Sequence, residues 1–96
     1  MKFTIHPEAK IEIVYHADYY EDKQPGLGEE FIEEIYATIQ RILEFPQAWQ
    51  KISKTTRRCL TSRFPFGVIY SIEPDRIRIL SVMLLNREPY YWKDRR

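Results

Sequence analysis

Apolar side chains recur at helical spacing in two stretches of the first half of the chain. Within residues 7–23, one stripe at this spacing predicts a buried helix face: Ala9, Ile13, Ala17 and Tyr20. Four further apolar residues lie off that stripe, which predicts a helix that is apolar on two sides: Ile11, Val14, Tyr15 and Tyr19. Residues 27–44 carry a second core stripe, with glutamates on the opposite face: Phe31, Ile35, Ile39 and Ile42.

Prolines and glycines set the ends of both predicted helices. Pro7 suits a first helical turn, where its missing N–H costs nothing. The segment QPGLGEE interrupts the pattern at residues 24–30 and predicts a tight turn between antiparallel helices. Pro46 ends the second helix, because the residue before a proline avoids helical dihedrals.

The second half of the chain reads as short strands. The pattern predicts strands at residues 2–6 (KFTIH), 57–64, 68–73 and 76–85, with turns at 65–67 and 74–75. Residues 46–56 are predicted to form a connecting loop in which Trp49 packs on the core. Alternation in the last strand predicts Arg78, Leu80, Val82 and Leu84 on one face and Ile77, Ile79, Ser81 and Met83 on the other. The order β-α-α-β-β-β predicts an α+β fold, in which a helical hairpin packs on one face of a small, curved, mainly antiparallel sheet.

Composition narrows the class of protein. Ninety-six residues, 44% hydrophobic and 15% aromatic, indicate one small domain over residues 1–96. There is no apolar run typical of a signal peptide or membrane span, so we expect a cytoplasmic protein that does not enter membranes. The single cysteine, Cys59, is expected to be a small buried hydrophobe, and His6 and His16 to have local structural roles. We therefore expect no metal and no other cofactor.

Charge is distributed unevenly along the chain. Residues 1–50 hold four basic and ten acidic side chains, a net charge of −6, whereas residues 51–96 hold eleven basic and four acidic ones, a net charge of +7. Since the first half is mostly helical and the second mostly strand, the folded molecule is predicted to be electrically polarised.

Arginines recur among the apolar residues of the strands, and two interpretations fit them. Alternation predicts Arg57, Cys59, Thr61 and Arg63 on one face, and Arg58, Leu60, Ser62 and Phe64 on the other. The arginines either keep sheet edges solvated or form a surface for an acidic peptide or a nucleic acid. The second interpretation gives the candidate partner and nucleic-acid surface as Arg57, Arg58, Arg63, Arg78 and Arg87.

The series of segments resembles the RelE/ParE superfamily of bacterial toxins from type II toxin–antitoxin modules. The resemblance rests on HPEAK, ADYYED, PGLGEEF, ILEFPQAW, RRCLTSRFPFGVIYSIEPDRIRILSV and REPYYW in this order, and it covers nearly all of the chain. It implies a groove occupied by a cognate antitoxin, in a toxin–antitoxin hetero-oligomer. It also implies a freed toxin that either cuts mRNA on the ribosome, as RelE-like members do, or poisons DNA gyrase, as ParE-like members do.

Two positions depart from the nuclease pattern of that superfamily. Gly67 stands where nuclease members commonly carry an arginine, and Leu84 where they often carry a histidine. The resemblance therefore favours the ParE-like, non-enzymatic side. The alternatives are a metal-free mRNA endonuclease, with Arg87, Tyr90 and Tyr91 as its candidate catalytic residues, and a module that binds antitoxin without toxicity.

Overall fold

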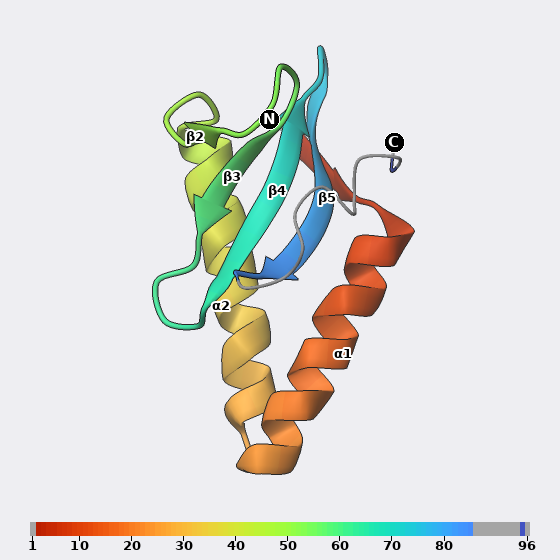
Figure 1. Cartoon of the computed structure of the whole chain (residues 1–96), viewed down its shortest axis with the longest axis vertical. Coiled ribbons are helices and arrows are strands. Elements are labelled where there is room, and N and C mark those ends of the chain that lie inside the picture. Colours follow the sequence, from red (N-terminus) through yellow and green to blue (C-terminus); the bar gives the residue numbers. More distant parts are fainter. Residues whose placement is uncertain (1, 86–94, 96) are drawn as a thin grey trace.

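The structure is a computed structural model that describes residues 2–85 and 95 (Figure 1). Its elements are β1 (Lys2–Ile5), α1 (Pro7–Lys23), α2 (Leu27–Glu44), β2 (Gln50–Lys51), β3 (Arg57–Leu60), β4 (Phe66–Ile72) and β5 (Arg76–Leu84). The five strands form one sheet in the order β1-β5-β4-β3-β2. β1 runs parallel to β5, and the other neighbours are antiparallel. The predicted α+β fold is confirmed, with β2 as an additional short strand.

Local capping explains why both helices have the predicted bounds. The ring Nδ1 of His6 accepts a hydrogen bond from the backbone N–H of Glu8, 3.1 Å away, and so caps the first turn of α1. At the turn, Gly26 has a φ of 89°, a conformation that favours glycine. The Glu21 carboxylate accepts hydrogen bonds from the N–H groups of Gly26 and Gly28, which caps the N-terminus of α2.

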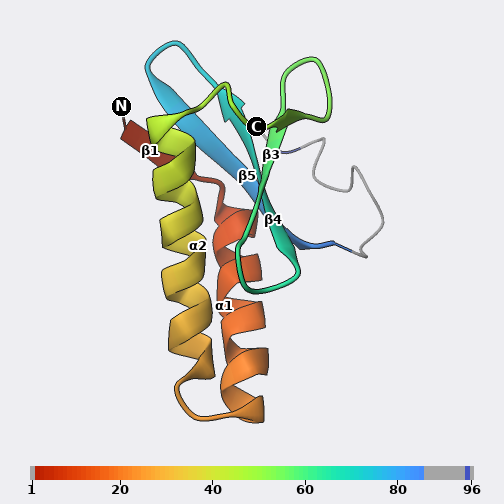
Figure 2. The same cartoon turned by 90° about the vertical axis from the view of Figure 1, so that its left-hand side faces the viewer.

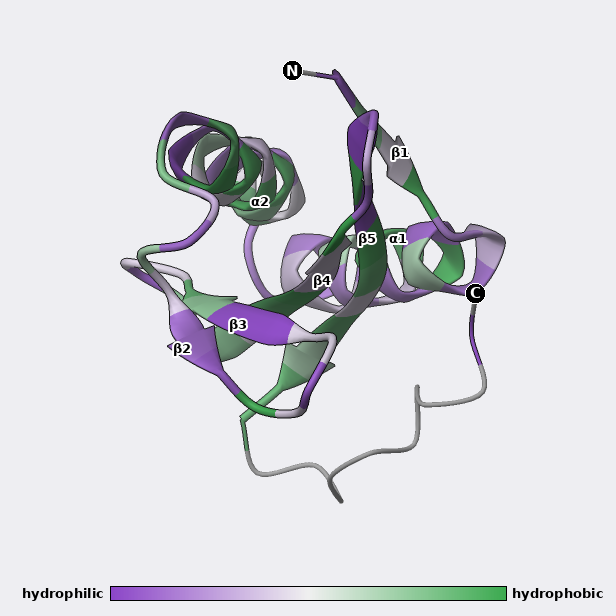
Figure 3. Cartoon of the chain, turned by 90° about the horizontal axis from the view of Figure 1, so that it is seen from above, coloured by the Kyte–Doolittle hydropathy of each residue, from purple (hydrophilic) through white to green (hydrophobic). Residues whose placement is uncertain are grey.

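The helices lie side by side on one face of the twisted sheet, and their connecting turn extends beyond it (Figures 1 and 2). The predicted stripes are buried there, with Ala9, Phe31, Ile35, Ile39 and Ile42 all at 0% exposure. In Figure 3, β4 and much of β5 are coloured hydrophobic, whereas hydrophilic colour gathers on β2 and β3 at one edge of the sheet. The core therefore forms between the hairpin and the central strands.

A β-bulge changes which residues of β5 share a face of the sheet, so the prediction for this strand is wrong. Ile69 pairs with Ser81 and Tyr70 with Ile79, which leaves Leu80 as an extra residue in β5. The extra residue shifts the alternation, so Val82 joins Ile77 and Ile79 in the core under the helices. Leu80 and Met83 instead pack with Ile69 in a second, smaller cluster.

The strand predicted over residues 57–64 is shorter in the structure, and β3 ends at Leu60. The Thr61 hydroxyl then donates to backbone carbonyls of the following turn, at Phe64 and Phe66, which favours a bend over continued pairing. The bend brings Phe64 into the same core cluster as Cys59, although alternation had placed the two residues on opposite faces. The predicted loop 46–56 contains β2, and its Trp49 packs against the core as predicted.

Candidate partner-binding surface

The outer face of α1 is apolar and open to solvent. Its four large side chains are Ile11, Val14, Tyr15 and Tyr19, with exposed fractions of 61%, 57%, 67% and 51%. The opposite side of the helix packs on the core through Ala9, Ile13 and Ala17. The prediction of a helix that is apolar on two sides is confirmed, and the second side is free to take a partner.

A hollow continues this surface between α1 and the adjoining end of the sheet. It has a volume of about 420 Å³ and is lined by Tyr15, His16, Tyr19, Tyr20, Phe66 and Leu84. Its floor is rigid, because the ring of His16 lies 4.7 Å from that of Phe66 and the ring of Tyr20 lies 4.8 Å from that of Phe64, centroid to centroid. Tyr15 also lines a shallower depression of about 350 Å³ beside Ile11 and Val14, so the hollow and the outer face of α1 are continuous.

The edge of β5 beside α1 is held by one carboxylate. β1 pairs with β5 only as far as Ile79. Beyond that point, Glu12 of α1 accepts hydrogen bonds from the Ser81 hydroxyl at 3.1 Å and from the Val82 N–H at 3.0 Å. Arg95 forms an ion pair with the same carboxylate at 3.0 Å and donates to the Leu80 carbonyl. Polar side chains thus fix the border of the apolar surface.

Burial keeps three potentially reactive groups neutral. It raises the pKa of Tyr20, with a smaller contribution from the neighbouring Tyr19. Burial also raises the pKa of Tyr70 to about 12 and raises the pKa of the Cys59 thiol. None of these groups provides a base or a thiolate nucleophile at neutral pH. Cys59 is free and fully buried, as expected of a small hydrophobe.

The candidate arginines are distributed over several parts of the molecule. The Arg57 guanidinium donates to the carbonyls of Gln47 and Trp49, at 3.1 and 2.9 Å, and so holds the segment that follows α2. Arg63, in the turn after β3, forms an ion pair with Glu30 on α2. The two guanidinium groups are therefore bound to different elements of the fold.

Two candidate arginines do share the sheet face that points away from the helices. Arg58 and Arg78 each neighbour a core residue in their strands, so they point to the opposite side. The Arg58 guanidinium donates to the Gln50 side chain, and that of Arg78 to the Thr4 hydroxyl, both at 3.0 Å. Both of these partners are uncharged, and neither guanidinium forms an ion pair with a carboxylate of residues 2–85.

Gly67 contacts Arg58 across that same face. A Cβ at residue 67 would stand 2.9 Å from the Cγ and Cδ atoms of Arg58, so any side chain there requires Arg58 to move. Leu84, the other departure from the nuclease pattern, packs against the core and lines the hollow. The remaining candidates, Arg87, Tyr90 and Tyr91, lie outside the described residues.

Residues 2–85 and 95 contain neither a candidate metal site nor a helix that could span a membrane. No cluster of three or more His, Cys, Asp or Glu side chains there is placed to bind a metal ion. No helix within these residues has the length and hydropathy needed to span a membrane.

Sequence reasoning found the outer face of α1 but missed the hollow beside it. The hollow joins α1 to Phe66 and Leu84, some fifty to seventy residues later in the chain, and helical spacing carries no signal for that juxtaposition. The local signal was a group of four aromatic or imidazole side chains within six residues: Tyr15, His16, Tyr19 and Tyr20.

Comparison with known proteins agrees with this architecture. A sequence model of the family described as "ParE toxin of type II toxin-antitoxin system, parDE" matches residues 3–87. Among solved structures, the chain is similar to one from the "Chromosomal ParDE TA system from P. aeruginosa", with a TM-score of 0.79 and 16% sequence identity. That match covers 90% of this chain and 97% of the other. No curated protein matches the sequence.

Proposed function

This chain belongs to the ParE family of toxins from type II toxin–antitoxin systems, and on that premise we propose that it arrests growth by poisoning DNA gyrase until a cognate antitoxin neutralises it. The observation that carries the proposal is the family match over residues 3–87, combined with an open apolar surface of the kind a protein partner covers. The protein acts in the cytoplasm, where gyrase and newly made antitoxin are found.

The antitoxin covers the outer face of α1 and the hollow beside it. Ile11, Val14, Tyr15 and Tyr19 occur at spacings of three and four residues, which suits the apolar face of an amphipathic helix or an extended segment. Toxin and antitoxin then form a hetero-oligomer in which this surface is buried. The P. aeruginosa structure comes from a ParDE system, which supports a protein partner of this kind.

The gyrase-facing surface is the sheet face that carries Arg58 and Arg78. Among the described residues, both guanidinium groups bind uncharged partners, so each can still meet an acidic or phosphate group. Arg63 lies elsewhere, beside Glu30 on α2, and would have to exchange that partner to meet a target carboxylate. Arg57 instead stabilises the loop that follows α2, through two backbone carbonyls.

Three features favour gyrase poisoning over mRNA cleavage. Gly67 replaces the nuclease arginine, and a side chain there would require Arg58 to move. Leu84 replaces the histidine, and Tyr70 has a pKa of about 12 that makes it a poor base. An mRNA endonuclease would instead depend on Arg87, Tyr90 and Tyr91.

The decisive experiment is controlled expression of the chain in its host, alone and with the small reading frame beside its gene. We expect growth arrest that the neighbouring gene relieves, together with loss of supercoiling by purified gyrase and intact cellular mRNA. Harmless expression would reject toxicity and favour a module that only binds antitoxin. Codon-positioned mRNA cuts with normal supercoiling would establish the endonuclease.

A further inference from the structure

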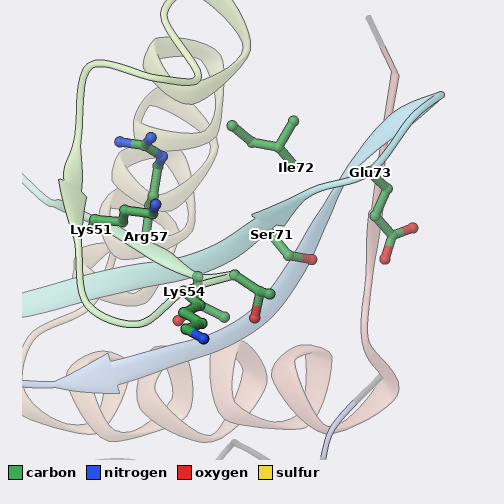
Figure 4. A pocket seen from close by; sticks show the side chains of 8 residues that line it. Lys51, Lys54, Arg57, Ser71, Ile72 and Glu73 are labelled. Carbon is green, nitrogen blue, oxygen red and sulfur yellow. The ribbon is translucent and has the colours of Figure 1, made fainter.

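A preformed cavity lies at the sheet edge far from α1, between the loop 52–56 and the end of β4 (Figure 4). Pairing between β3 and β4 stops at Arg57 and Tyr70, whereas β4 continues to Ile72, and the loop turns away at this point. The resulting cavity has a volume of about 350 Å³, and its lining comes from Lys51, Lys54, Thr55, Thr56, Arg57, Ser71, Ile72 and Glu73.

Internal hydrogen bonds fix the shape of the loop. The Ser53 hydroxyl accepts from the N–H groups of Thr55 and Thr56, at 3.2 and 3.1 Å. The Thr56 carbonyl in turn accepts from the N–H groups of Ile52 and Ser53. A ligand would therefore meet a turn that is already ordered, and binding would cost little conformational entropy.

Positive charge dominates the lining. Lys51 and Lys54 form no ion pair within the described part of the chain, and both are exposed. Arg57 also lines the cavity, but its guanidinium points away from Ser71 and donates to the carbonyls of Gln47 and Trp49 (Figure 4). The one acidic residue of the lining, Glu73, already forms an ion pair with Arg76 at 3.0 Å.

A buried hydroxyl in the lining has no partner. Ser71 is 3% exposed, and its Oγ makes no hydrogen bond among the described residues. Buried polar groups are normally satisfied, so an unpaired hydroxyl in a cavity wall points to an acceptor that arrives from outside. Figure 4 shows Ser71 lining the cavity, with Lys51 at the end of β2 and Lys54 on the loop that follows it.

From these observations we propose that this cavity binds the phosphate group of a phosphate ester, carried by a nucleotide or by a DNA backbone. Ammonium groups and hydroxyls arriving from several directions match an anion with several acceptor oxygens. A carboxylate of an acidic peptide offers two oxygens and one negative charge, whereas a phosphate monoester offers three terminal oxygens and between one and two negative charges at neutral pH. Ile72, which is 39% exposed, gives the ester's organic part an apolar contact.

The proposal goes beyond gyrase poisoning and is tested on the purified chain alone. ¹⁵N-labelled protein is titrated with inorganic phosphate, a mononucleotide, a short DNA duplex and a polyglutamate peptide, in chloride buffer of constant ionic strength. We expect phosphate-containing ligands to shift the amide signals of residues 51–57 and 71–73. Tighter binding of the duplex would identify the DNA backbone as the source of the bound phosphate group. Tighter binding of the mononucleotide would identify a free nucleotide as that source.

Two variants test the residues named, with one matched control. Lys54→Gln is expected to weaken phosphate binding about five- to tenfold, whereas Lys10→Gln, on α1, leaves it unchanged. Ser71→Ala should weaken phosphate binding about threefold yet raise the melting temperature of the free chain, because a buried unpaired hydroxyl is removed. A purely structural role for Ser71 would change the melting temperature alone.

Three results would overturn the proposal. One is the absence of amide shifts around the cavity at millimolar phosphate, and another is equal loss of binding in the Lys54 and Lys10 variants. The third is binding of polyglutamate at these residues without binding of phosphate, which would assign the cavity to an acidic peptide. Each of these results leaves the growth-arrest experiment unaffected, so the two proposals fail separately.

Discussion

Replacing two side chains on the outer face of α1 should separate antitoxin binding from folding. Ile11 and Tyr15 are 61% and 67% exposed, and both lie in the surface proposed to be covered by antitoxin. Fully burying an apolar side chain of this size contributes about 1.5–3 kcal/mol, so burying the remaining area gives about 1–2 kcal/mol each. The double variant Ile11→Gln/Tyr15→Gln should therefore lose about 2–4 kcal/mol of binding free energy, a rise in Kd of roughly 30- to 700-fold.

The chain offers a matched control on α2. Ile32 and Tyr36 have the same residue types and the same spacing, and are 36% and 45% exposed. Ile32→Gln/Tyr36→Gln should leave the affinity unchanged. Glutamine keeps helix propensity high, so both double variants should unfold near the wild-type temperature.

Isothermal titration of purified antitoxin, the product of the neighbouring reading frame, measures both affinities. Equal affinity of the Ile11/Tyr15 variant and the wild type would refute the assignment of this surface. Equal losses in both double variants would also refute it, because the effect would then be general to exposed helix residues.

Three further substitutions test single features of the structure. Tyr70 has a pKa of about 12 in the folded chain against about 10 when unfolded, so its ionisation removes up to about 3 kcal/mol of stability as pH rises from about 10 to 12, and none below pH 10. Tyr70→Phe should abolish that part of the alkaline loss in urea unfolding, and identical pH profiles would contradict this. Gly28→Val should lower the free energy of unfolding by about 3 kcal/mol, because a Cβ at residue 28 would stand 2.5 Å from the Ala17 carbonyl oxygen. An unchanged urea midpoint would show that the two helices can move apart without cost. Arg78→Gln should lower the free energy of unfolding by less than about 1 kcal/mol, because its partner is an uncharged hydroxyl. It should weaken gyrase inhibition more than Arg63→Gln does, because the charge of Arg63 is already paired with Glu30. The reverse order of the two variants in a supercoiling assay would count against the proposed target surface.

The sequence predicted the helices well because their signals are local. Pro7, the glycines of the turn and Pro46 mark the helix ends within a few residues of where they act. The sheet was harder to predict. β2 has only two residues, and both are polar, so it shows no apolar alternation. The bulge at Leu80 arises from pairing between β5 and β4, and the alternation within a single strand carries no information about that pairing.

The candidate arginines show the same limit. Alternation correctly placed Arg57 and Arg58 on opposite faces of β3. It could not show that Arg57 reaches the carbonyls after α2, because that contact depends on how the loop 46–56 folds back. The phosphate cavity was missed for a similar reason, since its lysines and Ser71 are about twenty residues apart and belong to different elements.

The two faces of α1 divide stability from recognition. Ala9, Ile13 and Ala17 pack into the core together with the partly buried Tyr20, whereas the large side chains of the outer face stay exposed. Lysines lie at both ends of the outer face, Lys10 beside Ile11, and Lys23 with its amine 5.0 Å from the ring centre of Tyr19. Asp18 and Asp22 of α1 are exposed as well, so charges of both signs surround this apolar face. Apolar burial would then supply most of the affinity for antitoxin, while these charges orient the bound segment along the helix. Added salt should accordingly slow association much more than it speeds dissociation, a kinetic pattern that an apolar surface without flanking charges would not produce.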